Sequence, residues 1–84
     1  MKHHATPGFC AAYKILPLGA RKAAEKSFSF LKSNPRHPSL HLKKVGRYWS
    51  ARSGLNHRTL GVDAPDGILW IWIGTHEEYD ELIG

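Results

Sequence analysis

Apolar residues near the start of the chain recur at helical spacing. Thr6-Pro7 has the composition of a helix start, because Thr can cap a helix and Pro is tolerated at its first position. Phe9 and Tyr13 follow, four residues apart, and give this short helix one apolar face. Pro17 ends the helix.

A second, longer helix is predicted from about Leu18 to Ser33. Small and apolar residues recur along it at helical spacing, namely Ala20, Ala23, Ala24, Ser27, Phe28 and Leu31. Asn34-Pro35 ends this helix, because the residue before a proline avoids helical backbone angles. Two helices separated by so short a break predict a helical hairpin.

After a proline-containing loop, the pattern changes to the alternation typical of β-strands. Leu40 and Leu42 alternate with His41 and Lys43 and predict a strand or extended edge, which Gly46 ends. Residues 48–53 and 57–62 predict two strands joined by a hairpin loop. After a turn that contains Pro and Gly, the apolar run at residues 68–73 predicts a central strand covered on both faces.

Residues 76–83 predict a short C-terminal helix, for which Thr75 is the expected N-cap. The order of the elements predicts an α+β fold. In it, an N-terminal helical hairpin packs on a roughly four-stranded antiparallel sheet, and the short C-terminal helix follows. A chain of 84 residues predicts one domain, residues 1–84.

The side chains expected in the core are mostly aromatic. Trp49, Trp70 and Trp72 are predicted to be core residues rather than platforms on which bases stack. Strand alternation places Trp70 and Trp72 on one face, so both belong to the core only if that face is covered. Cys10 is predicted to be a small buried side chain on the first helix. As it is the only cysteine, no intrachain disulfide can form.

The formal net charge of +5 is unevenly distributed. Ten of the twelve Lys and Arg residues lie between Arg21 and Arg58, where Glu25 is the only acidic residue. The other acidic residues all follow residue 62. A basic middle segment favours a polyanionic or acidic partner, and a merely solubilising surface is the alternative.

Nothing in the sequence suggests export or membrane insertion. The first residues include His3 and His4, to which no function is assigned, and no apolar stretch of a signal peptide follows them. The longest apolar run, residues 68–73, is too short to span a bilayer. These features and the lack of a disulfide framework predict a cytoplasmic protein without a membrane partner.

Basic side chains on the predicted hairpin are candidates for phosphate binding. Arg52 and Arg58 flank its loop, one on each strand, and two converging guanidinium groups can grip a phosphate. Lys43 and Lys44 precede the hairpin and are candidates for substrate binding. The alternatives are a pair of exposed strand arginines and two solvated charges on an edge strand.

His76, directly after the last strand, is the candidate for proton transfer, and a polar residue at a helix start is the alternative. Tyr79 lies one turn further and can either stack on a base or pack against the sheet. The sequence has no phosphate-binding loop and no CxxC or HExxH motif, and its six histidines lack ligand spacing. Neither a metal nor a cofactor is therefore predicted.

Four segments together resemble the RelE/ParE superfamily of toxins, in particular the branch described as cytotoxic translational repressors. They read NPRHPSLHLKKV at residues 34–45, YWSAR at 48–52, HRTLGV at 57–62 and WIWIGTHEEYD at 70–80. The helical hairpin before them also fits. The resemblance covers nearly the whole chain, and the combination of segments is more specific than any one of them.

The resemblance implies the toxin of a type II toxin–antitoxin system, with an acidic antitoxin, mRNA and the ribosome as partners. RelE-like members cleave mRNA without a metal: the 2′-OH of the RNA attacks the adjacent phosphate, basic residues stabilise the charge and a general acid protonates the leaving oxygen. By position, Arg52, Arg58 and His76 match the catalytic set, and Lys43 and Lys44 match the basic segment before the hairpin.

The chain departs from the family pattern at two points. Ser50 stands where some RelE-like toxins carry a lysine, and Tyr79 falls earlier along the last helix than the catalytic tyrosine of the family. Two alternatives therefore stay open. One is a ParE-like poison of DNA gyrase, and the other is a module without catalytic activity that only binds its antitoxin.

Overall fold

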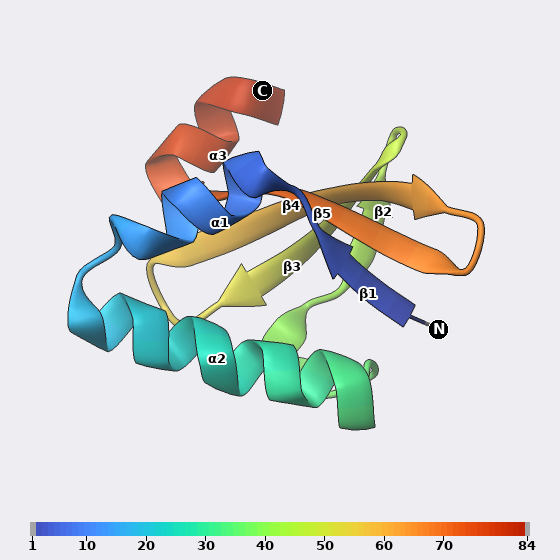
Figure 1. The fold of residues 1–84 in the computed structure, drawn as a ribbon, viewed down its shortest axis with the longest axis horizontal. Coiled ribbons are helices and arrows are strands. Elements are labelled where there is room, and N and C mark those ends of the chain that lie inside the picture. The colour runs from blue at the N-terminus through green and yellow to red at the C-terminus, as the bar shows by residue number, and fades with distance from the viewer. Residues whose placement is uncertain (1, 84) are drawn as a thin grey trace.

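The computed structural model describes residues 2–83, which form a five-stranded sheet with helices on both of its faces (Figure 1). In chain order the elements are β1 (Lys2–Ala5), α1 (Pro7–Lys14), α2 (Leu18–Ser33), a 3₁₀ helix (Pro38–Leu40), β2 (Lys43–Val45), β3 (Tyr48–Ser53), β4 (His57–Ala64), β5 (Gly67–Thr75) and α3 (His76–Ile83). The strand order is β1-β5-β4-β3-β2. The β1–β5 pair is parallel, and the other pairs are antiparallel.

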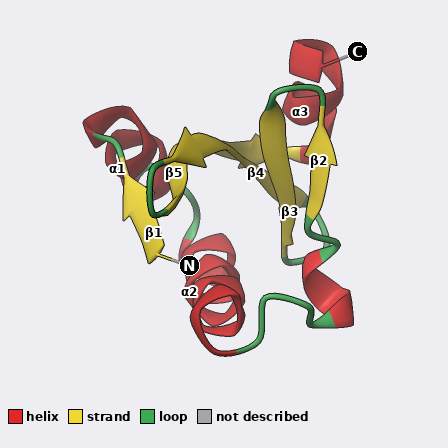
Figure 2. Ribbon diagram, turned by 90° about the vertical axis from the view of Figure 1, so that its right-hand side faces the viewer, coloured by secondary structure: helices red, strands yellow, loops and turns green. Residues whose placement is uncertain are grey.

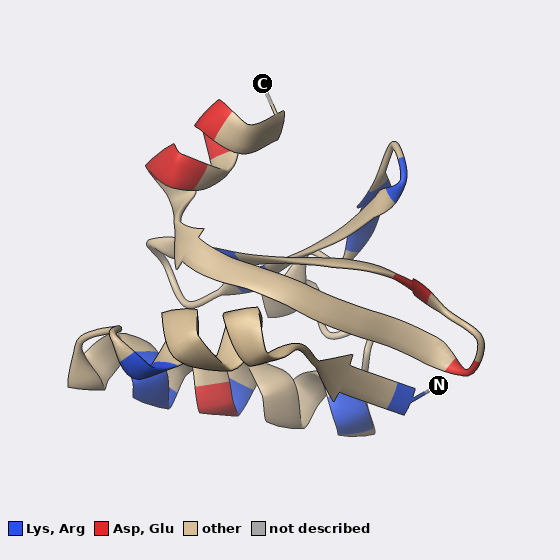
Figure 3. Cartoon of the chain, turned by 45° about the horizontal axis from the view of Figure 1, so that its top comes forward, with Lys and Arg blue, Asp and Glu red and all other residues tan. Residues whose placement is uncertain are grey.

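Helices α1 and α2 pack on one face of the sheet, and α3 lies on the other (Figures 2 and 3). The predicted helical hairpin is confirmed. The rings of Phe9 and Phe28 meet edge to face with their centroids 6.2 Å apart, and the Tyr13 hydroxyl donates a 2.8 Å hydrogen bond to Glu25. The core lies between this hairpin and the sheet, where Trp70 is fully buried. The predicted α+β class is therefore correct.

Strand β1 was not predicted from the sequence. Its presence makes the sheet five-stranded rather than about four-stranded, and mixed rather than antiparallel. His3, to which no role was assigned, anchors this strand. Its Nδ1 accepts a hydrogen bond from Trp70 Nε1, and its Nε2 donates one to the carbonyl oxygen of Leu31, both at 3.2 Å. A parallel partner so distant in the chain leaves no local pattern, because parallel strands are joined by long crossover connections.

The strand or extended edge predicted before Gly46 is confirmed at Lys43–Val45, but its predicted start at Leu40 and Leu42 is wrong. Leu40 ends a 3₁₀ helix that begins at Pro38, and its side chain is fully buried. The His37 side chain caps this turn by accepting a hydrogen bond from the backbone N–H of Ser39. Since the turn uses these residues, the edge strand β2 begins only at Lys43.

A β-bulge in β5 separates the two tryptophans that were expected on one face. Leu60 is the register partner of Trp72 and Gly61 that of Trp70, so β5 carries one extra residue, Ile71, at this point. Trp70 therefore faces the helical hairpin, whereas Trp72 is only half-buried, on the face where α3 lies. The predicted coverage of β5 is complete on the hairpin side only.

Cys10 is exposed, contrary to the prediction that it is buried. The neighbouring Phe9 takes the inward position on α1 and belongs to the core cluster. An aromatic ring fills that position with far more apolar surface than a thiol can supply. Adjacent positions on a helix face different directions, which leaves Cys10 toward solvent.

The stability of the fold should fall in acid because of His3. Burial is the main cause that lowers the pKa of His3 below its ordinary value of 6.5. As the pH falls below about 6.5, the unfolded chain takes up this proton before the folded chain does, which favours unfolding. We expect the melting temperature to drop between about pH 7.5 and about pH 5.5, and His3→Gln to reduce that drop. His4→Gln is the control, because His4 is exposed and its ion pair with Asp66 lies at the surface. An unchanged acid response in His3→Gln would contradict this assignment.

Candidate functional site

The centre of the candidate site is Arg58, near the start of β4, where it pairs with Arg52 of β3 and Gly74 of β5. Its side chain is only 5% exposed. One terminal nitrogen donates a 3.0 Å hydrogen bond to Ser50 Oγ, and the guanidinium carbon lies 4.6 Å from the centroid of the Tyr79 ring. No ion pair within residues 2–83 includes Arg58, and its buried Nε has no hydrogen-bond partner there.

The buried positive charge of Arg58 lacks a compensating negative charge among the described residues. Transfer of a charge from water into the protein is costly unless a partner compensates it. A hydroxyl group and the face of an aromatic ring supply part of that compensation, but neither carries a negative charge. The guanidinium group retains unused donors in a planar fork, the geometry that binds phosphate oxygens.

Tyr79 covers Arg58 from α3. It is 4% exposed, and its hydroxyl is buried without a hydrogen-bond partner among the described residues. The start of α3 is fixed by a reciprocal pair of bonds: Thr75 Oγ1 accepts from the backbone N–H of Glu78, and Glu78 Oε1 accepts from the N–H and hydroxyl of Thr75. These donors lower the pKa of Glu78. The prediction of Thr75 as N-cap is confirmed, and this cap holds Tyr79 over the sheet.

His76 lies at the rim of the site, on the first turn of α3. Its side chain is half exposed, and its ring centroid is 6.1 Å from that of Tyr79. Its Nδ1 lies 3.1 Å from Asp80 Oδ2, one turn along the helix, and its backbone N–H donates to the carbonyl oxygen of Asn56. The carboxylate of Asp80 orients the imidazole through Nδ1. The other ring nitrogen, Nε2, takes no part in this contact.

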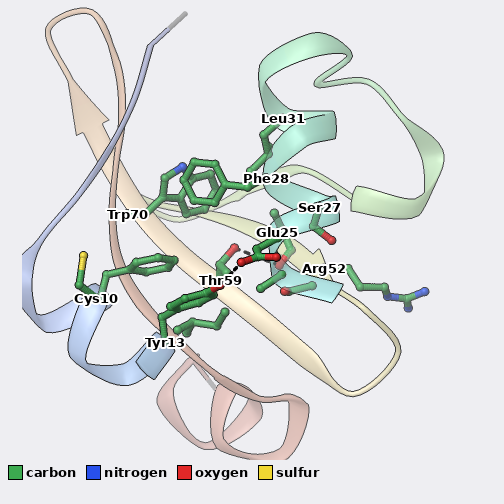
Figure 4. A pocket seen from close by; sticks show the side chains of 14 residues that line it. Cys10, Tyr13, Glu25, Ser27, Phe28, Leu31, Arg52, Thr59 and Trp70 are labelled. Atoms are coloured by element: carbon green, nitrogen blue, oxygen red, sulfur yellow. Dashed lines mark hydrogen bonds between the residues drawn. The ribbon is translucent and has the colours of Figure 1, made fainter. Parts of the chain in front are cut away.

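Arg52 and Arg58 are register partners, as expected for residues that flank a hairpin loop. Their guanidinium groups nevertheless do not converge, contrary to the expectation. Arg58 lies under Tyr79, whereas Arg52 borders the pockets beside α2. Its guanidinium group extends away from the pocket between the helical hairpin and the sheet (Figure 4). Like charges directly opposite one another repel, and this repulsion favours the divergent arrangement.

The two candidate lysines lie on opposite faces of the sheet. Lys43 pairs with Ser50 and therefore shares the face of Arg58, and its side chain is exposed. Lys44 pairs with Trp49, and its Nζ forms an ion pair with Asp63 and lies 5.0 Å from the centroid of the Trp49 ring. The bond from Lys44 is the main cause that lowers the pKa of Asp63. Lys43 therefore lies on the same face of the sheet as Arg58, whereas Lys44 lies on the opposite face and is paired with Asp63.

Ser50 is the residue of this site that sequence reasoning did not select. It is fully buried and accepts the one hydrogen bond that Arg58 makes to another side chain. The alternation along residues 48–53 already carried a signal, since it places Ser50 on the face opposite Trp49 and Ala51. The small side chain of Ser50 leaves room on this face for the long side chain of Arg58.

Within residues 2–83, no three His, Cys, Asp or Glu side chains are grouped so that they could hold a metal ion. None of the helices in the described part of the chain is both long enough and apolar enough to cross a lipid bilayer.

Several solved toxin structures share this arrangement of helices and strands. The RelB–RelE antitoxin–toxin complex from Methanococcus jannaschii matches with a TM-score of 0.72 and 19% identity over 96% of this chain and 99% of that one. A YoeB/ParE toxin from Agrobacterium tumefaciens matches with a TM-score of 0.69 and 16% identity over 90% of this chain and 99% of that one. The isolated RelE toxin of E. coli matches with a TM-score of 0.62 and 14% identity over 96% and 93% of the two chains.

No protein-family model matches the sequence, and no curated protein matches it either. The likeness is therefore one of three-dimensional structure, and it covers almost the whole of both chains. The chain has the fold of the RelE/ParE toxins, as the resemblance of its sequence segments implied.

Proposed function

We propose that this chain is the toxin of a type II toxin–antitoxin system and that it blocks translation by cleaving mRNA without a metal. The observation that carries the proposal is Arg58, a buried cation with no carboxylate partner among the described residues. The phosphate at the cleaved bond would supply the missing anion. The exposed Lys43 on the same face would hold the RNA backbone beside it.

The residues of this face suit transesterification of RNA. The 2′-oxygen bonds to phosphorus, the bond from phosphorus to the 5′-oxygen breaks, and a 2′,3′-cyclic phosphate and a 5′-hydroxyl result. Arg58 stabilises the negative charge that builds up on the phosphate oxygens. His76, oriented by Asp80, donates the proton that the leaving 5′-oxygen takes up, and water removes the proton of the 2′-hydroxyl.

Access to Arg58 requires Tyr79 to move. Tyr79 lies over the guanidinium group and is itself buried, so a phosphate can reach Arg58 only when α3 shifts away from the sheet. The exposed ring would then be available to stack on a base, which unites the two roles considered for Tyr79. Arg52, whose guanidinium group extends away from its pocket, is assigned to the rim, where it contacts more distant phosphates.

The proposed partners follow from charge and from the similar structures. Acidic residues are concentrated in α3, whereas most basic residues lie in the middle of the chain (Figure 3). The solved complexes from Methanococcus jannaschii and Pyrococcus horikoshii contain RelE together with RelB. For this chain we propose an acidic antitoxin that binds the basic surface and forms a hetero-oligomer with the toxin in the cytoplasm.

Induced expression, followed by mapping of mRNA 5′ ends, tests the proposal. Growth should stop, and new 5′-hydroxyl ends should accumulate within translated mRNA. Gyrase-linked DNA breaks with intact mRNA would replace the proposal with a gyrase poison. Undisturbed growth of cells that contain folded protein would replace it with a module that only binds an antitoxin.

The two adjacent lysines provide a matched pair of variants. Lys43→Ala should weaken RNA binding and reduce the dependence of log K on log salt by about one unit, because one phosphate contact is lost. Lys44→Ala removes the same charge from the opposite face and should change both quantities less. Equilibrium titration of a labelled RNA at several salt concentrations measures both. Equal losses in the two variants would argue against the Arg58 face as the RNA surface.

A further inference from the structure

A pocket of about 180 Å³ lies between the helical hairpin and the sheet, on the face opposite the site of Arg58 (Figure 4). Its walls are largely apolar and rich in aromatic rings, with Phe9 and Tyr13 from α1, Phe28 from α2 and Trp70 from β5. On the solvent side, the Tyr13 hydroxyl donates its hydrogen bond to Glu25 and so links the two helices. The RNA chemistry proposed above uses none of these residues.

Among the described residues that line this pocket, one buried polar side-chain atom has no hydrogen-bond partner. Ser53 lines the pocket and is 2% exposed, and its Oγ has no hydrogen-bond partner among the described residues. A buried hydroxyl without a partner costs roughly 1–3 kcal/mol, so native structures rarely leave one unpaired. Of the other hydroxyls that line the pocket, that of Thr59 donates to the carbonyl oxygen of Ala51 and that of Tyr13 to Glu25, while Ser27 is only partly buried. Among the described residues that line the pocket, Ser53 therefore carries the buried hydroxyl that lacks a partner, and a molecule in the pocket could supply one.

We propose that this pocket binds a small, uncharged aromatic molecule that carries one hydroxyl group, as phenols do. Cavities of about 150 Å³ with apolar walls are large enough for one benzene ring. The surrounding rings favour an aromatic guest, because they offer faces and edges for stacked and edge-to-face contacts. Ser53 Oγ supplies the single polar contact.

The charges around the pocket favour a neutral guest. Glu25 already accepts the hydrogen bond of Tyr13, and the guanidinium group of Arg52 extends away from the pocket (Figure 4). No cationic side chain is therefore directed into the pocket to compensate an anion inside the apolar walls, where an uncompensated charge is costly. Benzoate should bind much more weakly than phenol.

Titration of the full chain with phenol and with toluene, followed by NMR, tests the proposal. Both should bind saturably, with shift changes and intermolecular NOEs at Phe9, Phe28 and Trp70. Ser53→Ala should weaken phenol binding roughly five- to tenfold and leave toluene binding nearly unchanged, because only phenol uses the hydroxyl. Ser29→Ala, an exposed serine on α2 outside the pocket, is the matched control.

A second variant tests the location. Ala24→Leu adds bulk to the pocket wall and should abolish binding of both compounds. Should that variant fail to fold, the NOEs of the wild-type protein decide the location alone. The proposal is overturned if neither compound saturates, if the NOEs lie elsewhere, or if Ser53→Ala weakens phenol and toluene equally. These outcomes are independent of RNA cleavage, since the pocket lies on the other face of the sheet.

Discussion

Arg58→Met should lower the rate of RNA cleavage by roughly 10²–10³-fold while the folded state becomes no less stable. Cleavage falls because the charge that faces the phosphate is lost. Stability is retained because Met fills similar space and needs no partner, whereas Arg58 is a buried cation without a carboxylate partner among the described residues. Active-site charges that destabilise the fold are a common compromise between stability and function.

Single-turnover cleavage and thermal unfolding should be measured on the same preparations. Arg52→Met is the matched control, because it makes the same chemical change at the register partner of Arg58. The guanidinium group that lies over Tyr79 is that of Arg58, whereas Arg52 borders the pockets beside α2. The cleavage rate of Arg52→Met should therefore fall much less. A large loss of stability in Arg58→Met, or an equal loss of cleavage in both variants, would contradict the role given to Arg58.

Trp70→Ala should destabilise the protein by about 3–5 kcal/mol. Trp70 is fully buried, and its indole N–H donates to His3, so the substitution removes both a large core side chain and the anchor of β1. A domain of this size has a total stability of roughly 4–13 kcal/mol. Much of the variant should therefore be unfolded at moderate temperature.

Trp72→Ala provides the comparison. The bulge in β5 places Trp72 on the other face, where it is half-buried, so its removal should cost clearly less than that of Trp70. Urea unfolding monitored by circular dichroism gives both free energies. Equal losses in the free energy of unfolding would mean that the two tryptophans lie in the same environment, as regular strand alternation predicts.

The elements predicted correctly are those determined by residues that lie close together in the sequence. The bounds of α2 at Leu18–Ser33 and of β3 at Tyr48–Ser53 agree with the spacing of their apolar residues and with their flanking prolines and glycine. Thr75 was predicted as an N-cap because capping depends on residues three positions apart. The fold class followed from the order of such elements.

Features that depend on distant residues could not be predicted in this way. The pairing of β1 with β5, the 3₁₀ helix at Leu40 and the bulge beside Trp70 arise from tertiary packing rather than from periodicity.

In the candidate site, the sequence identified the basic residues but not their surroundings. That Tyr79 covers Arg58 depends on where α3 crosses the sheet, and that Lys44 is engaged by Asp63 depends on the register of β2 with β3 and β4. The chemistry that a side chain can perform is therefore predictable from the sequence, whereas the partner that it contacts in the fold is not.

The parallel pairing of β1 with β5 also affects how fast the protein folds. Lys2 and Ala5 pair with Gly67 and Trp70, so β1 can join the sheet only after β5, more than sixty residues later in the chain, has been synthesised. Such distant pairing raises the contact order, and it slows folding because the entropy of closing a long loop is lost before the contacts repay it. During that interval the apolar face of α1 lacks β5, its main support, which leaves a nascent chain prone to aggregation. Refolding should therefore be slow for a chain of this length, and its last phase should be the burial of Trp70.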